Sequence, residues 1–220
     1  MKIQLYTLIA MLVALGLAIL ITKKHLFYPL SSSTNVLAKI LEQRYSGYSF
    51  DPLKHVTHNQ IISLIKAAQL TPSSYNEQPW NFIISDKTTN PEAYNITLSS
   101  LAEGNKKWAK DAQLLVVIAT SIHSVATNEP NQWAQYDTGA AAFSMTIQAT
   151  ALGLMTHQMA GFDRSKITEL LGLPKDVIPM SIMAIGYEDL ARSKIQPRRR
   201  KPIGDNFFQG MWGITNSNWK

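Results

Sequence analysis

Residues 72–82 read PSSYNEQPWNF, which is unusually polar and stiff for a connection between two regular elements. Asn76 and Gln78 each offer a hydrogen-bond donor and an acceptor, as recognition of the edge of a heterocycle such as a flavin or a base requires. Pro72 and Pro79 restrict the backbone, so that less conformational entropy is lost on binding. The stretch therefore predicts a preorganised ligand-binding loop that leads into a strand.

The residues on either side of this loop predict one α+β domain with more helix than strand. Thr57 is expected to cap a helix that runs to Gln69, because an apolar stripe recurs along that segment and a proline follows it. The uninterrupted apolar run LLVVIAT at 114–120 is typical of a strand buried on both faces. The remaining expected elements are helices over 36–43, 92–103, 136–154 and 165–171, and strands over 80–85, 156–159 and 180–186.

Composition narrows the class of protein. The chain has 220 residues, 45% of them hydrophobic and none of them cysteine, which suits a domain with a sizeable core and excludes disulfide scaffolds and cysteine nucleophiles. No GxSxG, HExxH, P-loop or GxGxxG motif is present. His55 and His58 have the spacing of a metal-binding pair, but no third ligand follows, so no metal site is predicted. His157 is expected to be a hydrogen-bonded core residue on a strand.

The N-terminal segment predicts a membrane anchor. Residues 3–22 carry no charge and are apolar enough to span about 30 Å of hydrocarbon as a helix. A cleaved signal peptide and a buried soluble helix are the alternatives. We therefore divide the chain into an anchor or signal segment at 1–24, a linker at 25–35 and a domain at 36–220. The flanking lysines do not decide the orientation of the anchor.

The formal charge of +6 does not indicate a nucleic-acid-binding protein. Residues 192–201 contain six basic residues and no acidic one, so this short proline-flanked run accounts for the whole excess. A nucleic-acid-binding face would spread its basic residues among aromatic ones. A phosphate clamp and a membrane-surface patch both suit the run. A second anion-binding candidate is Arg44, because Ser46 supplies a hydroxyl two residues away; an exposed turn is the alternative.

These segments together resemble the nitroreductase family of flavin oxidoreductases over about residues 36–213. PSSYNEQPWNF at 72–82 is similar to the family signature PSxxNxQPWxF. RYSGY at 44–48 resembles the family's Arg-x-Ser-x-basic element, although Tyr48 stands where a basic residue is usual. QMAGFD at 158–163 is similar to the segment beside the reactive flavin ring. Asn105, Arg198 and Arg200 match the family's asparagine near the flavin pyrimidine and its C-terminal basic pair.

The resemblance implies a nitroreductase-like α+β fold, with a central mixed sheet flanked by helices and preceded by one hydrophobic helix. It also implies a homodimer that binds FMN at its interface, with Arg44, Ser46, Asn105 and Arg200 from one subunit and residues 72–78 from the other. The small residues at 139–142 are then a dimer contact or, alternatively, part of the core. The implied cofactor-binding residues are Arg44, Tyr45, Ser46, Tyr48, Pro72, Ser73, Ser74, Asn76, Gln78, Asn105, Met159, Ala160, Gly161, Arg198 and Arg200.

The implied activity follows from the flavin, and no catalytic side chain is predicted. NAD(P)H would pass hydride to flavin N5 and be replaced by a nitroaromatic, a quinone or a similar acceptor in ping-pong turnover. The protein would position the ring and neutralise the phosphate. A reductive dehalogenase of the same architecture and a non-catalytic, membrane-tethered flavin-binding module are the alternatives. We expect the flavin domain to be cytoplasmic, because reduced nicotinamide is available in the cytoplasm.

Overall fold

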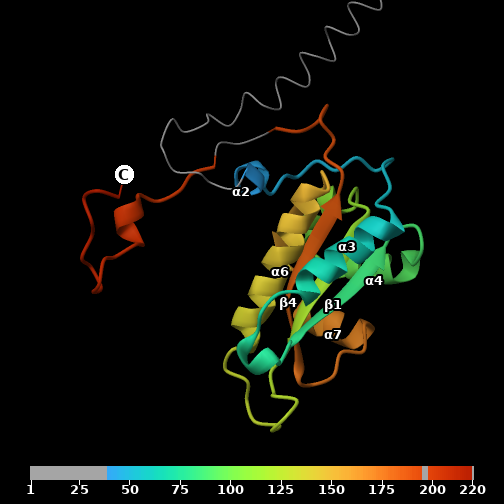
Figure 1. The fold of residues 1–220 in the computed structure, drawn as a ribbon. Coiled ribbons are helices and arrows are strands. Elements are labelled where there is room, and N and C mark those ends of the chain that lie inside the picture. Colours follow the sequence, from blue (N-terminus) through green and yellow to red (C-terminus); the bar gives the residue numbers. More distant parts are fainter. Residues whose placement is uncertain (1–38, 195–197, 220) are drawn as a thin grey trace, which may run out of the picture.

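The computed structural model describes residues 39–194 and 198–219 (Figure 1). The predicted anchor at 3–22, the linker at 25–35 and the beginning of the helix expected from residue 36 lie outside the described residues. Of the helices that are described, none has the length and apolar character needed to cross a bilayer. The first described element of the domain is helix α2 (Lys39–Gln43).

The centre of the fold is a four-stranded sheet in the order β1-β2-β4-β3. The strands are β1 (Trp80–Asp86), β2 (Leu114–Ser121), β3 (Met155–Met159) and β4 (Val177–Gly186), all close to their expected bounds. The α+β prediction is confirmed. All three strand pairings are antiparallel, however, so the prediction of a mixed sheet is wrong for the described residues.

The antiparallel pairing of β1 with β2 has a cause in the connection between them. A single polar helix was expected over 92–103, whereas the chain forms α4 (Pro91–Ser100) and α5 (Glu103–Ala109). Leu101 separates the two helices, because it is extended, buried and bridged to Phe162. These two helices return the chain to the end of the sheet at which β1 finishes. Strand β2 therefore begins opposite the end of β1, with Asp86 paired to Leu114.

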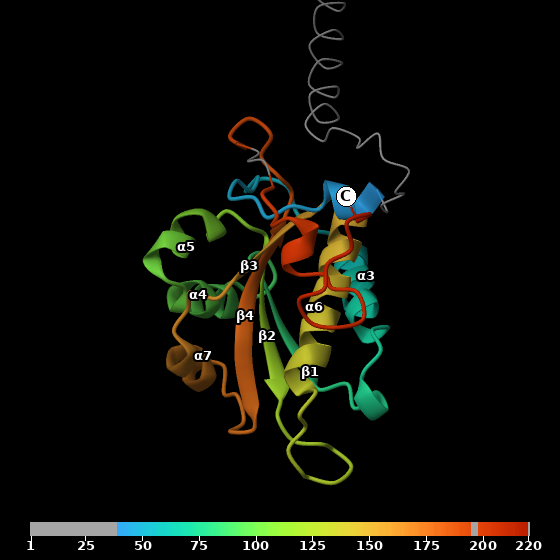
Figure 2. The same ribbon diagram turned by 90° about the vertical axis from the view of Figure 1, so that its left-hand side faces the viewer.

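Helices cover both faces of the sheet (Figure 2). Helices α3 (His58–Gln69) and α6 (Ala134–Ala151) lie on one face, and α4, α5 and α7 (Arg164–Leu170) lie on the other. Strand β2 supplies both cores: Val116 and Ile118 pack in the first, and Leu115 and Val117 in the second. The prediction of a strand buried on both faces is therefore confirmed. Two short 3-10 helices complete the fold, η1 (Ser74–Asn76) and η2 (Ile203–Asp205).

The predicted beginning of helix α3 is confirmed in atomic detail. Thr57 accepts from the backbone N–H of Gln60 at 3.3 Å, and the Gln60 side chain accepts from the backbone N–H of Thr57 at 2.9 Å. This reciprocal capping box satisfies two N–H groups that a helix start leaves without partners. Helix α3 then carries the chain from the end of the domain that holds α2 to the opposite end, where residues 72–78 lie (Figure 1).

Candidate functional site

The first group of predicted site residues is Arg44–Tyr48, which we call the arginine segment and which directly follows α2. Arg44 Nη1 donates to Ser46 Oγ at 3.4 Å. Gly47 is buried against β3, and a Cβ atom at this position would lie 2.3 Å from the sulfur of Met155 and 2.9 Å from the Tyr45 ring. Any larger residue at position 47 would therefore have to displace the side chains of Met155 and Tyr45.

At the end of the arginine segment, the aromatic ring of Tyr48 packs against two others, those of Trp108 and His157. The ring of Tyr48 lies 4.7 Å from that of His157 and 5.2 Å from that of Trp108, and His157 and Trp108 are 4.6 Å apart. His157 Nδ1 is 3.0 Å from the carbonyl oxygen of Gly47. Because a carbonyl only accepts, Nδ1 carries the proton in this bond. Burial lowers the pKa of His157, which favours the neutral ring. The prediction of a hydrogen-bonded histidine on a strand is confirmed, but the prediction of a core residue is wrong, because the His157 side chain is only half-buried.

Asn105 and Gly161, predicted as separate flavin contacts, lie together. Asn105 Nδ2 donates to the Gly161 carbonyl at 3.1 Å, and the backbone N–H of Ala102 donates to the same oxygen at 2.9 Å. A Cβ atom on Gly161 would lie 3.1 Å from Asn105 Nδ2, so a side chain there would crowd this contact. Of the neighbouring predicted residues, Ala160 is exposed, whereas Met159 is buried in the core.

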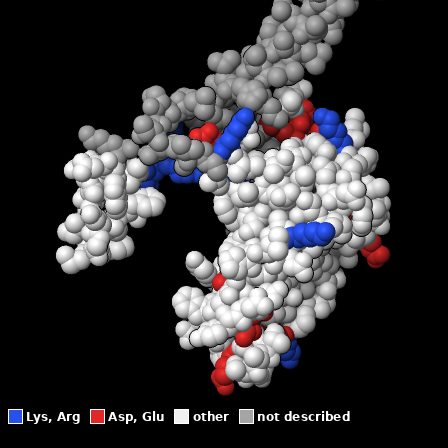
Figure 3. Space-filling model, in the orientation of Figure 1, with Lys and Arg blue, Asp and Glu red and all other residues white. Residues whose placement is uncertain are grey.

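Of the predicted basic pair, Arg198 contacts the residues just before the arginine segment, and Arg200 contacts its own neighbour. Arg198 donates from its two Nη atoms to the carbonyls of Leu41 and Glu42, at 3.2 and 2.7 Å. These carbonyls are at the end of α2, two to three residues before Arg44. Arg200 Nη1 donates to the carbonyl of Arg199 at 2.8 Å. Figure 3 shows both basic and acidic side chains at this end of the molecule, and Arg198 brings one cation beside the arginine segment.

The second group is Pro72–Gln78, which we call the proline loop. Tyr75, Asn76 and Gln78 have φ values of 50°, 57° and 48°. Such left-handed conformations are costly for residues other than glycine and concentrate at functional sites. The loop is held by internal bonds, since Ser73 Oγ accepts from the backbone N–H of Gln78 at 3.0 Å and Gln78 Nε2 donates to the carbonyl of Asn76 at 3.2 Å. The predicted rigidity therefore has a structural basis.

Two acidic side chains that were not predicted as site residues anchor the proline loop. Asp137 is buried in the first turn of α6 and accepts from the backbone N–H of Ser74 at 3.0 Å. Glu77 accepts from Ser124 Oγ at 2.6 Å and from the backbone N–H of Val125 at 3.0 Å. Nothing local in the sequence marks these acids, because their partners come from distant segments.

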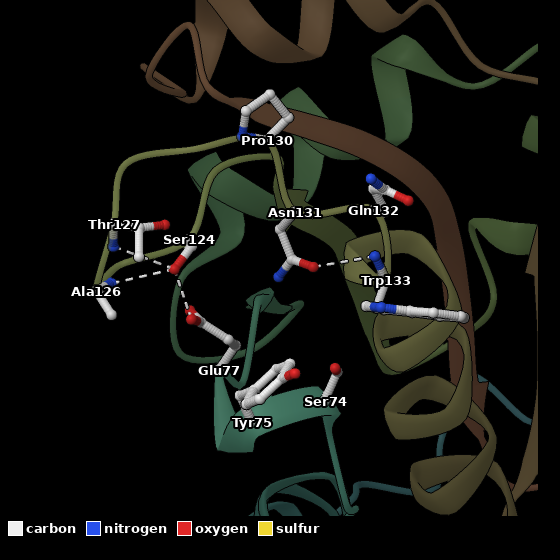
Figure 4. Close-up of a pocket in the computed structure, with 10 residues that line it drawn as sticks. All are labelled: Ser74, Tyr75, Glu77, Ser124, Ala126, Thr127, Pro130, Asn131, Gln132 and Trp133. Atoms are coloured by element: carbon white, nitrogen blue, oxygen red, sulfur yellow. Dashed lines mark hydrogen bonds between the residues drawn. The ribbon is translucent and has the colours of Figure 1, made fainter.

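A pocket of about 490 Å³ opens between the proline loop and the segment that precedes α6 (Figure 4). Its lining includes Ser74, Glu77 and the exposed ring of Trp133. Asn131 Oδ1 accepts from the backbone N–H of Trp133 at 3.0 Å, whereas its buried Nδ2 has no hydrogen-bond partner among the described residues. The pocket thus offers one unsatisfied donor beside an aromatic face.

The arginine segment and the proline loop lie at opposite ends of the domain. Helix α3 separates them, and its 12 residues span about 18 Å. Both views show α2 and the arginine segment at one end, and η1 at the other (Figures 1 and 2). The structure therefore brings Arg44–Tyr48, Asn105, Gly161 and Arg198 to one region but leaves residues 72–78 outside it.

Comparisons with known proteins identify relatives of this fold. A crystal structure described as an oxidoreductase containing FMN superimposes with a TM-score of 0.76 at 29% identity, covering 84% of this chain and 96% of its own. A Desulfovibrio desulfuricans protein crystallised with FMN has the same fold, with a TM-score of 0.67 at 17% identity over 82% of this chain and 99% of its own. YdgI of Bacillus subtilis, named as a candidate NAD(P)H nitroreductase, is 24% identical over 186 residues, which are 70% of this chain and 88% of YdgI.

The family model that matches this chain is that of the nitroreductases, over residues 41–187. The match begins before the arginine segment and ends just after β4, so it includes the sheet, the proline loop and the contact between Asn105 and Gly161. The solved structures extend the likeness to the three-dimensional fold. On this agreement of sequence and architecture, the chain belongs to the nitroreductase family.

Proposed function

We propose that this protein is an FMN-dependent oxidoreductase that oxidises NAD(P)H and reduces a nitroaromatic, a quinone or a similar acceptor. One observation carries the proposal: contacts link the arginine segment to Asn105 and Gly161. Tyr48 packs on Trp108 of α5, and Asn105, one turn earlier in that helix, bonds to Gly161. Family membership and relatives described as NAD(P)H nitroreductases and FMN-containing oxidoreductases support the same activity.

The residues in this region suit FMN by their chemistry. A phosphate needs cationic and hydroxyl donors, which Arg44 and Ser46 provide as a bonded pair. The edge of the flavin needs amide groups, which Asn105 of this region and Asn76 and Gln78 of the proline loop provide. When bound, FMN supplies hydride transfer from NAD(P)H to the acceptor.

The chain's own residues bind and orient, and we assign no proton transfer to a side chain. Arg44 and Ser46 hold the phosphate, with Arg198 and Arg200 adding positive charge from the C-terminal run. Arg198 also ties that run to the end of α2. Asn105 and the backbone at Gly161 orient the ring, because their mutual bond restricts both elements. The positive charge also stabilises the anionic cofactor in its binding site.

We further propose that two copies of the chain complete each site. The proline loop lies at the far end of α3 from the arginine segment, so a second copy is the source of the loop for a flavin held at Arg44. Apolar surface supports this assembly: on α6, Tyr136 is 75% and Phe143 is 47% exposed, and in the C-terminal segment Trp212 is 89% exposed. Of the small residues, Gly139 is on this outer face, whereas Ala141 and Ala142 pack in the core. Burying such surface in a dimer is favourable.

The membrane attachment stays a prediction from the sequence alone. We propose that residues 3–22 anchor the protein and that its flavin domain is cytoplasmic, supported by the uncharged apolar run and by the supply of reduced nicotinamide in that compartment. The full-length chain should sediment with membranes and resist extraction by carbonate. A chain that begins at residue 25 should remain in the supernatant; sedimentation of both would overturn the anchor.

The visible spectrum of the purified full-length protein tests the activity. We expect flavin absorption that bleaches when NADPH or NADH is added without oxygen and returns when a quinone or a nitroaromatic is added. Steady-state oxidation of each nucleotide then identifies the preferred donor. A correctly folded protein that is colourless and takes up no added FMN would refute the proposed function.

A further inference from the structure

The position of His157 is unexplained by the contacts assigned so far. It lies on β3, it is half-buried against the rings of Tyr48 and Trp108, and among the described residues it bonds to the carbonyl of Gly47. Gly47 itself is buried, so without His157 this carbonyl would lose its polar partner in an apolar environment, which is costly. The bond from His157 is therefore expected to stabilise the backbone at Gly47.

The segment that this bond holds is the proposed phosphate site. Gly47 directly follows Ser46 and is three residues from Arg44, so a bond that fixes the Gly47 backbone restrains the short segment that carries both polar side chains. The close fit of Gly47 against Met155 restrains the same backbone from the other side. Tyr48, 62% exposed, covers His157 with its ring, so that water has less access to the bond.

We propose that His157 is a positioning residue that acts through the Gly47 carbonyl to hold Arg44 and Ser46 in the conformation that binds the phosphate of FMN. Tyr48, at the place where a basic residue would add charge, contributes by packing on His157 and not by contacting the phosphate. The inference rests on the proposed function. Histidine acts here as a hydrogen-bond donor and a packing surface.

Because FMN and riboflavin differ only in the phosphate, they separate this role from a general loss of structure. We would measure dissociation constants of both flavins for the full-length protein by the quenching of flavin fluorescence. His157→Phe keeps an aromatic ring but removes the donor. We expect it to weaken FMN binding about 10-fold, because binding must then restore the conformation of the segment, and to leave riboflavin binding nearly unchanged.

Three further comparisons distinguish positioning from a general effect on structure. His157→Asn places an amide nitrogen close to the position of Nδ1, so it should recover most of the preference for FMN over riboflavin. His58→Phe is the matched control, because His58 is exposed at the beginning of α3, and it should preserve that preference. In Arg44→Ala, which lacks the guanidinium that the segment positions, adding His157→Phe should cause little further loss of FMN affinity.

Different outcomes would contradict the positioning role of His157 and the proposed FMN-dependent function. If the wild-type protein binds FMN and His157→Phe, folded by circular dichroism, keeps the wild-type ratio of FMN to riboflavin affinity, the positioning role is wrong and the proposed function stands. If both flavins weaken equally in His157→Phe and His157→Asn, the role is structural only and the inference also fails. A folded wild-type protein that binds neither flavin contradicts the proposed function itself. Long-range ¹H–¹⁵N spectra should show the proton of His157 on Nδ1; a proton on Nε2 alone would contradict the bond to Gly47.

Discussion

The arginine segment and the proline loop are both polar and both match nitroreductase motifs, yet the fold holds them by different means. Tertiary contacts with β3 and α5 shape the arginine segment, through the buried Gly47 and the rings around Tyr48. The proline loop carries its own shape, in left-handed residues and internal hydrogen bonds, and attaches to α6 through Asp137. A loop that holds its own conformation can contribute to a site on a neighbouring molecule, as the shared site that we propose requires.

The largest expected effect comes from mixing two defective proteins. Arg44→Ala removes a cation from the arginine segment, and the double variant Asn76→Ala with Gln78→Ala removes the amides of the proline loop. Each alone should lose most of its FMN. Random reassociation of equal amounts should restore about a quarter of the flavin sites, because half of the dimers are then mixed and each holds one intact site.

Absorbance of bound flavin after gel filtration measures this recovery, with each variant reassociated with itself as the control. A mixture that binds no more flavin than its components would show that the two groups do not come from different copies. The arginine segment and the proline loop of different copies would then not share a flavin site.

Removing positive charge from the C-terminal basic run is the next largest effect. Arg200→Ala should weaken FMN binding about 10-fold, because a hydrogen bond between charged partners contributes about 1.5–3 kcal/mol. Arg200→Lys should lose less, and Lys175→Ala, which removes an exposed cation outside the candidate site, should bind FMN as the wild type does. If Arg200→Ala retains full flavin after dilution and gel filtration, the phosphate assignment is wrong.

The attachment of the proline loop should affect stability. Asp137→Ala leaves the backbone N–H of Ser74 without its partner, so we expect the free energy of unfolding to fall by about 2 kcal/mol. Asp176→Ala, at an exposed aspartate, should change it by less than about 0.5 kcal/mol. Urea denaturation followed by circular dichroism compares the two. Equal stabilities would mean that Asp137 does not hold the loop.

The smallest expected effect is a pH dependence from His157, which bonds to the arginine segment. Burial lowers the pKa of His157 in the folded protein, so the unfolded chain binds the proton more readily. Stability linked to this residue is therefore present above the ordinary histidine pKa and is lost as the pH falls from there through the folded pKa. The free energy of unfolding should decline less between pH 7 and pH 5 in His157→Phe than in the wild type. Parallel declines would assign the acid sensitivity to other groups.

Much of the fold was predictable because local chemistry specified it. Thr57 and Gln60 form their capping box within four residues of chain, and the apolar run of β2 marks a strand buried on both faces. The division of 92–103 into α4 and α5 was not predictable, since it depends on Leu101 meeting Phe162, a residue far along the chain. The mixed sheet was wrongly expected for the same reason: the direction of β2 depends on where two helices return the chain.

The sequence by itself determined the family, the elements of the domain and the polar motifs, because these depend on residue types at short spacings. Only the tertiary structure decided which of those motifs lie together. It joined Asn105 to Gly161 and His157 to Gly47, assigned Asp137 to the proline loop, and separated that loop from Arg44 by the length of α3. The physical reason is that each of these bonds joins groups more than 50 residues apart in the chain, and such partners are chosen by packing of whole elements and not by local preference.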